Sequence, residues 1–226
     1  MNSSEKLVLI RRLEKLFSAI ISDVLDEMGY VDNVLSPNIR PIFVNARVVG
    51  CARTALTEYH EKFVAYDQAE WLSVMIRMLG SAMAGDVFVV STHEKVRAAS
   101  WGELMSNAAQ RRGAKGAIVD GAVRDVPRIL SMKKPFPVFA EAFTPTDSKG
   151  RLKFMEYDIP IKCGGVNVEP GDFIFGDLDG AVCIPKREAA RVAQQAEDRL
   201  KREDRFRRAV RRGMPVSEAF AKYKTF

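Results

Sequence analysis

The segment from 101 to 125, WGELMSNAAQRRGAKGAIVDGAVRD, constrains the fold of this chain more than any other stretch. Apolar residues recur at helical spacing after Gly102, and Gly113 is placed to end that helix. The apolar run 117–119 predicts a short buried strand, which we expect Asp120-Gly121 to break. The sequence therefore predicts a helix–turn–strand unit whose two functional ends meet at one pocket.

The start of the predicted helix is suited to binding an anion. Gly102 has no side chain, and the first N–H groups of a helix have no partner within it. A carboxylate would fit there. The candidate substrate-binding residues at this end are Gly102, Glu103, Leu104 and Met105.

The end of the predicted strand delivers two charged residues, Arg124 and Asp125. An arginine can form paired hydrogen bonds to a carboxylate or to a developing oxyanion. An aspartate is a hard oxygen ligand that suits Mg²⁺, which keeps several waters and takes only one or two carboxylates. The alternative is a surface ion pair, and spacing alone favours that interpretation.

Two motifs within this segment carry a family resemblance. Gly102-Glu103-Leu104-Met105, followed by DGAVRD at 120–125, resembles the core motif of the RraA-like family. That family includes divalent-metal (class II) 4-hydroxy-4-methyl-2-oxoglutarate and 4-carboxy-4-hydroxy-2-oxoadipate aldolases. It also includes proteins named as regulators of ribonuclease E activity.

The resemblance extends along most of the chain. Further segments are similar to family elements and occur in the family's order. They are Ser22–Gly29, Gly85–Val90, Pro137–Ala140, Pro170–Asp172 with Asp177–Val182, and Glu218–Tyr223.

The fold that the resemblance implies is a single α/β domain over 1–226, the swivelling β/β/α architecture that is phosphohistidine-domain-like. The family assembles as a trimer or a dimer of trimers, so we expect a homotrimer or homohexamer, with the C-terminal helical extension 186–226 packing on a neighbouring subunit. The residues alone predict only mixed α and β structure with a helix at each end.

The activity that the resemblance implies is a lyase reaction on a small 2-oxo acid. Residues 102–105 would hold the pyruvyl carboxylate, Arg124 would bind the carbonyl or enolate oxygen, and Asp125 would anchor Mg²⁺ or Mn²⁺. A 4-hydroxy-2-oxo acid would be cleaved to pyruvate and a second carbonyl compound, and the same enolate chemistry would decarboxylate oxaloacetate.

One position departs from the aldolase pattern. The family's aldolases have an acid after two further residues beyond the Arg-Asp pair, whereas this chain has Arg128 there, a cation that would weaken metal binding if it faced the site. Glu103 and, from a neighbouring subunit, Glu203 are candidates to compensate. The alternative function is a non-catalytic regulator that binds a ribonuclease or RNA.

Composition and charge narrow the class of protein. The chain has 226 residues, 47% of them hydrophobic and 28% charged, which is typical of a globular domain. It begins without a signal-peptide pattern and has no apolar run near the ~20 residues of a membrane span. We therefore expect a cytoplasmic protein with no membrane partner. Three isolated cysteines predict buried free thiols.

Other segments predict secondary structure. Apolar spacing predicts one amphipathic helix over 5–28 and a second helix over 60–83, a segment that departs from the usual family sequence. Short β-type runs occur at 42–44 and 47–49, and alternating apolar runs and glycine turns over 159–185 predict antiparallel hairpins.

The final helical region carries the basic excess of the chain. Residues 186–212 contain eleven Lys or Arg and five Asp or Glu, a local net charge of +6 that equals the formal total. Such a segment can attract nucleic acid. The acids interrupt the charge and few aromatics are interleaved, so a solvated helix face is favoured and a nucleic-acid partner is not expected.

Overall fold

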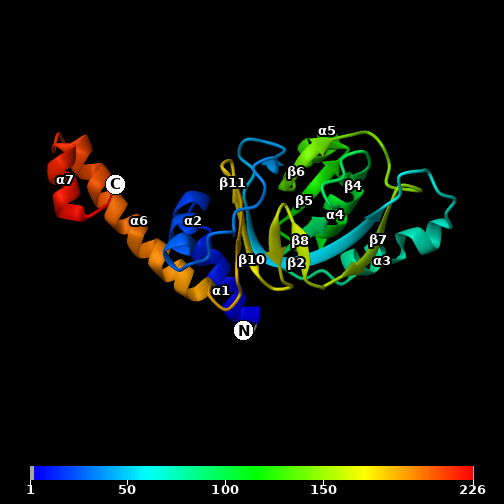
Figure 1. Ribbon diagram of the computed structural model, residues 1–226, viewed down its shortest axis with the longest axis horizontal. Coiled ribbons are helices and arrows are strands. Elements are labelled where there is room, and N and C mark those ends of the chain that lie inside the picture. The colour runs from blue at the N-terminus through cyan, green and yellow to red at the C-terminus, as the bar shows by residue number, and fades with distance from the viewer. Residues whose placement is uncertain (1–2, 226) are drawn as a thin grey trace.

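The computed structural model describes residues 3–225 as a sheet-based body with a helical arm at one side (Figure 1). The helices are α1 (Ser3–Leu13), α2 (Ser18–Glu27), α3 (Gln68–Gly80), α4 (Glu103–Arg111), α5 (Val126–Leu130), α6 (Ala189–Arg211) and α7 (Val216–Tyr223). The strands are β1 (Arg40–Pro41), β2 (Val48–Tyr59), β3 (Asp86–Ser91), β4 (Ala99–Trp101), β5 (Gly116–Val123), β6 (Val138–Phe143), β7 (Leu152–Tyr157), β8 (Ile161–Cys163), β9 (Val166–Val168), β10 (Phe173–Asp177) and β11 (Gly180–Ile184).

A nine-stranded mixed sheet forms the body. Its path is β1-β6-β5-β3-β2-β10-β11, with β4 added beside β5 and β7 beside β2. The strands β2, β3, β5 and β6 pair in parallel, as does β4 with β5, whereas β10 and β11 pair antiparallel. This mixed α/β architecture with terminal helices confirms the predicted α/β fold class.

Three apolar clusters hold the layers together. One lies under α3 and α4 and contains the buried rings of Phe88, Trp101 and Phe136. A second joins α1, α2 and the first half of α6 to β10 and β11, and a third joins the sheet to the β8–β9 hairpin. Every residue of β5 is buried, as expected for a central strand of a covered parallel sheet.

The prediction of one helix over 5–28 was wrong in one respect, because the chain breaks between α1 and α2. The Asp177 carboxylate accepts hydrogen bonds from the Ser18 N–H (2.9 Å) and hydroxyl (2.6 Å), and Arg47 donates to the Leu16 carbonyl. These contacts come from distant parts of the chain. They satisfy the backbone groups that the break exposes.

Two other boundaries differ from the sequence prediction. The helix predicted over 60–83 is limited to α3, whose first turn is capped by the Asp67 side chain accepting from the Glu70 N–H at 2.9 Å. The run 42–44 forms no strand, and β2 begins at Val48.

Asp120-Gly121 does not end β5, contrary to the prediction. The strand continues to Val123 through a register shift between Val119 and Ala122. The buried Asp120 carboxylate accepts from the N–H groups of Thr92 and Gly164, and burial raises its pKa. A side chain at Gly121 would lie 2.2 Å from the Thr92 hydroxyl, so the bulge requires glycine here.

Several predictions are confirmed. The region 159–185 forms two antiparallel hairpins, β8–β9 and β10–β11. The three cysteines are free and buried. Gly113 ends α4 with a positive φ of 86°. Among the helices of residues 3–225, none is both long and apolar enough to cross a membrane.

We predict that Asp177→Ala lowers the free energy of unfolding by about 1–2 kcal/mol, because it removes the acceptor that caps the start of α2. Urea unfolding monitored by circular dichroism measures this change. The control is Asp179→Ala, whose exposed carboxylate forms no hydrogen bond or ion pair with residues 3–225. Equal effects of the two substitutions would contradict the capping role.

Candidate functional site

The parallel pairing of β4 with β5 brings the two ends of the site together. Trp101 at the end of β4 pairs with Val123 at the end of β5, so both strands leave the sheet at the same edge. Gly102 then begins α4, and Arg124 and Asp125 lead into α5. A hydrogen bond of 2.9 Å from the Arg124 N–H to the Trp101 carbonyl ties the two connections.

Asp125 adopts an unusual backbone conformation that aims its carboxylate at α4. Its φ of 58° is in the left-handed region, which is uncommon for a residue with a side chain. Its Oδ2 accepts from the Glu103 N–H at 3.3 Å. A side chain at Gly102 would lie 2.8 Å from the same oxygen, so this close approach requires glycine.

Arg124 lies between two carboxylates. Its Nε is 3.4 Å from Asp125 Oδ2, and its other guanidinium edge is 3.2 Å from Asp147 Oδ1 in the connection after β6. Partial burial of Asp147 favours the neutral acid. Arg124 and Lys149 outweigh this effect and hold the pKa of Asp147 below its ordinary value.

These residues line a cleft of about 170 Å³. Its lining comes from α3, β4, the start of α4 and the connections after β5 and β6. The lining residues are Leu72, Met75, Ala99, Ser100, Trp101, Gly102, Leu104, Met105, Arg124, Asp125, Asp147, Ser148 and Lys149.

The structure brings most of the predicted site residues to this cleft. Gly102, Leu104 and Met105 line it together with Arg124 and Asp125. Leu104 and Met105 lie in the first turn of α4, where N–H groups have no carbonyl partner within the helix.

Two charged residues lie in a neighbouring groove instead. The Glu103 side chain accepts from Asn107 Nδ2 at 2.5 Å and, with Arg128, lines a separate hollow that also contains Lys133 and Lys134. Arg128 is exposed, and it is not among the residues that line the cleft. The cation at this position therefore does not face Asp125 from within the cleft.

The donor set of the cleft fits a hydrated divalent ion held by one carboxylate. Within residues 3–225 no three His, Cys, Asp or Glu side chains form a metal-binding group, and Asp125 Oδ1 makes no hydrogen bond. One free carboxylate oxygen suits Mg²⁺, which retains most of its waters. Asp125 is the residue that would hold it.

Most of the chain matches one protein family. Residues 18–183 match the RraA-like model, described as Aldolase/RraA. The chain belongs to the RraA-like family.

Individual RraA-like relatives agree over nearly the whole chain. A Halalkalibacterium halodurans protein with the provisional name of a 4-hydroxy-4-methyl-2-oxoglutarate aldolase is 31% identical over 92% of this chain and 91% of its own. The crystal structure of Streptomyces coelicolor RraAS2, described as an unusual member of the RNase ES inhibitor RraA family, has a TM-score of 0.77 at 29% identity, covering 87% of this chain and 94% of its own. An uncharacterised Pseudomonas syringae pv. tomato protein has a TM-score of 0.81 at 25% identity, covering 94% and 96%.

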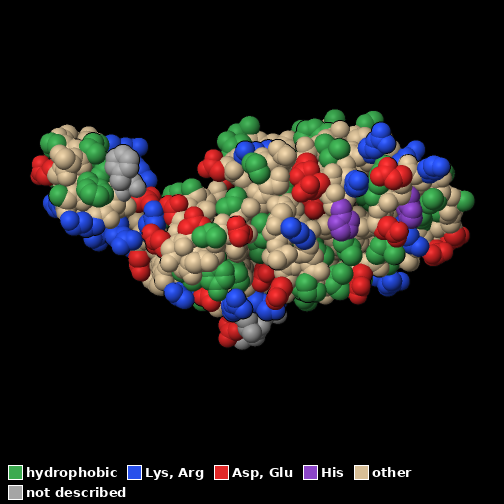
Figure 2. Space-filling view, viewed as in Figure 1, with side chains coloured by type: hydrophobic (Ala, Val, Ile, Leu, Met, Phe, Trp, Pro, Cys, Tyr) green, Lys and Arg blue, Asp and Glu red, His purple; other side chains and the backbone are tan. Residues whose placement is uncertain are grey.

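The arm of this RraA-like chain lies away from the cleft. The second half of α6 projects from the body, and α7 packs against its end (Figure 1). Lys and Arg side chains gather on the arm (Figure 2). Glu203 on α6 pairs with Arg199 at 3.3 Å within the same chain.

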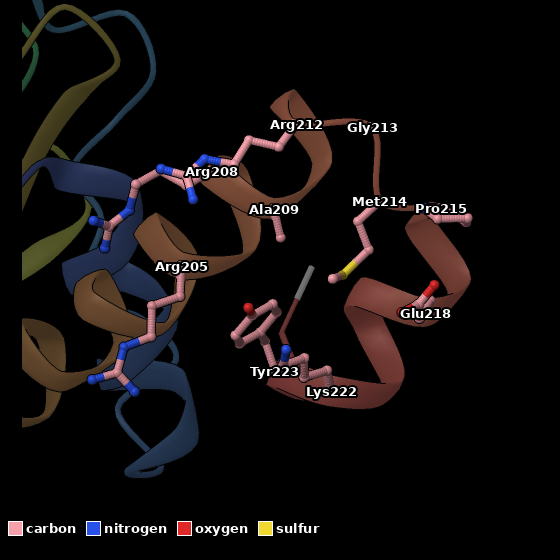
Figure 3. Close-up of a pocket in the computed structure, with 10 residues that line it drawn as sticks. All are labelled: Arg205, Arg208, Ala209, Arg212, Gly213, Met214, Pro215, Glu218, Lys222 and Tyr223. Atoms are coloured by element: carbon pink, nitrogen blue, oxygen red, sulfur yellow. The ribbon is translucent and has the colours of Figure 1, made fainter.

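A groove lies between α6 and α7, and three arginines are among the residues that line it. Arg205, Arg208 and Arg212 extend from α6 to one side, while Met214 and Tyr223 lie between the helices (Figure 3). Within the part of the chain that the structure describes, these three arginines form no ion pair with a carboxylate.

Sequence reasoning missed the other residues of the cleft. Asp147 and Lys149 belong to the segment 147–150, whose composition is typical of a turn, and the approach of Asp147 to Arg124 depends on long-range packing. Met75 fits the apolar face of a core-facing helix by its spacing, and both Leu72 and Met75 are half-buried where α3 borders the cleft. Ser100 could have been identified as a cleft residue from the sequence, because it lies two residues before Gly102.

We predict that Asp147→Asn destabilises the protein in a pH-dependent manner. A carboxyl whose pKa is lower in the folded than in the unfolded state contributes stability above its unfolded pKa, about 3.9 for Asp, and loses it as pH falls through the folded value. The difference in unfolding free energy between wild type and variant should thus be constant from about pH 5 to 8 and shrink below pH 4. Urea unfolding across this range measures it, and a difference independent of pH would contradict the ion pair.

Proposed function

We propose that this RraA-like protein is a divalent-metal-dependent lyase that cleaves a 4-hydroxy-2-oxo acid to pyruvate and a second carbonyl compound. The observation that carries the proposal is the convergence of Arg124, Asp125 and the first turn of α4 on one cleft. The aldolase names of relatives support the same reaction class. Pyruvate release from oxaloacetate is expected from the same site.

The residues of the chain have distinct roles in this proposal. The free N–H groups at Leu104 and Met105 bind the substrate carboxylate, because a helix start favours negative charge. Arg124 binds the 2-oxo oxygen and stabilises the negative charge that develops there when the C3–C4 bond breaks. Asp147 orients Arg124 from the side opposite Asp125.

Asp125 would hold Mg²⁺ or Mn²⁺ through its unbonded Oδ1. When bound, a divalent ion would supply Lewis-acid polarisation of the 2-oxo group. The family's assembly favours a homotrimer or homohexamer in which the 186–226 extension contacts a neighbouring subunit. Glu203 of that extension is then the acid that one subunit would contribute to the metal site of its neighbour. We propose a cytoplasmic location for this reaction.

We predict that Arg124→Ala lowers kcat/KM for pyruvate release by about 10²–10³, and that Asp125→Ala abolishes the metal-dependent part. The assay couples pyruvate from oxaloacetate or 4-hydroxy-4-methyl-2-oxoglutarate to lactate dehydrogenase, with Mg²⁺, Mn²⁺ or EDTA. Arg128→Ala is the matched control and should retain activity, since Arg128 lies outside the cleft.

The same assay tests Glu103. Unchanged turnover in Glu103→Gln would refute a catalytic role for its carboxylate, which Asn107 holds away from the cleft lining. No pyruvate from either substrate, in a folded wild-type protein that also binds no metal, would overturn the lyase proposal.

A second candidate function is regulation through an anionic partner, a ribonuclease segment or RNA. The specific observation is the group of arginines on α6, Arg205, Arg208 and Arg212, which lacks carboxylate partners among the described residues. We predict that Arg205→Glu with Arg212→Glu abolishes any RNA binding measured by fluorescence anisotropy at about 50 mM salt.

The matched control for the arm is Arg207→Glu, because Arg207 is already paired with Asp204 and Glu203. Loss of binding with the control alone, or binding that is indifferent to salt, would contradict the assignment of this surface.

A further inference from the structure

The strand that leads to the cleft contains one extra residue. β5 pairs with β6 up to Val119, and the pairing resumes at Ala122. Between these positions β5 has Asp120 and Gly121, whereas β6 has only Glu141. A bulge of this kind bends the strand, increases its twist and changes the direction of the side chains that follow.

The two charged residues of the cleft come directly after this bulge. Ala122 and Val123 pair with β6 beyond it, and Arg124 and Asp125 are next along the chain. Side chains alternate between the two faces of a strand, so a slip of one residue would turn over this end of β5. The positions of Arg124 and Asp125 therefore depend on the extra residue.

The Asp120 carboxylate joins the bulge to two other elements. It is 2% exposed, and its Oδ1 accepts from the Thr92 N–H, which follows β3. Its Oδ2 accepts from the Gly164 N–H, in the turn between β8 and β9, at 3.3 Å. The Thr92 hydroxyl also donates to the Asp120 carbonyl at 2.9 Å. The bulge is thus held by the end of β3 on one side and by the β8–β9 turn on the other.

Hydrogen bonds alone support this buried carboxylate. Burial raises the pKa of Asp120, and no cation within residues 3–225 forms an ion pair with it. The Ser91 hydroxyl, 3.3 Å from Oδ2, is the remaining polar neighbour of the carboxylate in the described chain. Because these neutral groups take the place of water, loss of the carboxylate would free the bulge from both elements.

Gly121 completes the bulge. An added Cβ at this position would lie 2.2 Å from the Thr92 hydroxyl oxygen and 2.8 Å from the Lys95 carbonyl oxygen. The segment after β3 therefore packs directly on the bulge, and a larger residue does not fit without a shift of the backbone.

We propose that Asp120 is a positioning residue for the reaction in the cleft. By holding the bulge against the end of β3 and the β8–β9 turn, it fixes the place from which Arg124 reaches the 2-oxo oxygen. Asp120 is not among the residues that line the cleft, so it acts through the strand and does not contact the substrate. This inference rests on the proposed function, which assigns the reaction to Arg124.

Asp172 provides a matched control. Its carboxylate is 6% exposed and accepts from the N–H groups of Glu169 at 2.9 Å and Lys186 at 2.8 Å. It is also a buried carboxylate held by two backbone N–H groups, and it does not line the cleft. Asp120→Asn and Asp172→Asn each exchange one acceptor oxygen for an NH₂ group, so both should lower the free energy of unfolding.

The first test measures pyruvate release from oxaloacetate with Mg²⁺, at a temperature where circular dichroism shows each variant to be folded. We expect Asp120→Asn to lower kcat about ten- to hundredfold and to leave KM within about twofold. The reason is that Arg124 acts on the charge that develops in the reaction, whereas α4 binds the carboxylate of the substrate. Asp172→Asn should change neither constant. Equal kinetic effects of the two variants would make Asp120 a structural residue only and overturn the proposal.

The second test does not require turnover. Burial acts to raise the pKa of Asp147, and Arg124 with Lys149 lowers it below its ordinary value. An NMR titration of the Asp147 carboxyl therefore reports whether the Arg124 guanidinium stays in place. We expect the Asp147 pKa to rise in Asp120→Asn and to match wild type in Asp172→Asn. An unchanged Asp147 titration in Asp120→Asn would contradict the positioning role.

The two tests separate this inference from the proposed function. If the wild-type protein releases no pyruvate but the Asp147 titration shifts in Asp120→Asn alone, Asp120 positions Arg124 and the proposed function fails. If the wild-type protein is active and neither test distinguishes Asp120→Asn from Asp172→Asn, the proposed function stands and the positioning role fails.

Discussion

The contact between the Asp125 carboxylate and the Glu103 N–H is the interaction on which the site depends. It exists because β4 and β5 run in parallel and end at the same edge, so that the chain after each strand meets the other. The left-handed backbone of Asp125 and the absence of a side chain at Gly102 make the approach possible. The same contact leaves one oxygen of Asp125 free for a ligand.

The surroundings hold this arrangement from two sides. Beneath it, the indole N–H of the buried Trp101 donates to the Ser106 hydroxyl at 2.9 Å, which anchors the start of α4 to β4. Above it, Asp147 fixes the far side of Arg124. A rotation of Arg124 would break ion pairs with two carboxylates, so the guanidinium is oriented before any substrate arrives.

Local sequence predicted the parts of the site whose cause is local. The helix after Gly102, its end at Gly113 and the charged pair after the strand follow from residue spacing, and all are confirmed. Asp147 and the α3 wall were not predictable in this way, because their positions depend on contacts between segments more than 20 residues apart. The direction of Glu103 was missed because Asn107, one helical turn later, competes for its carboxylate.

The errors in the fold have a similar origin. The helix break before Ser18 is stabilised by Asp177, which lies 159 positions further along the chain, and periodicity cannot report such a partner. The strand through Asp120-Gly121 persists because Thr92 and Gly164 satisfy the buried carboxylate, although the same dipeptide favours a turn in isolation. In both cases an acidic side chain supplies hydrogen bonds that the local pattern does not contain.

The backbone pairing of residues 60–64 with 150–151 separates selectivity from chemistry along the chain. Arg124 and Asp125 follow β5 and the first helical turn belongs to α4, whereas Leu72 and Met75 of the cleft come from α3. Main-chain hydrogen bonds in the segment before α3 help to hold that helix in place. Because those bonds do not involve side chains at 72 or 75, the wall can be reshaped by substitution without moving Arg124 or Asp125. A chain built in this way can change the ligand that its cleft accepts while the charged groups at the strand ends stay in place.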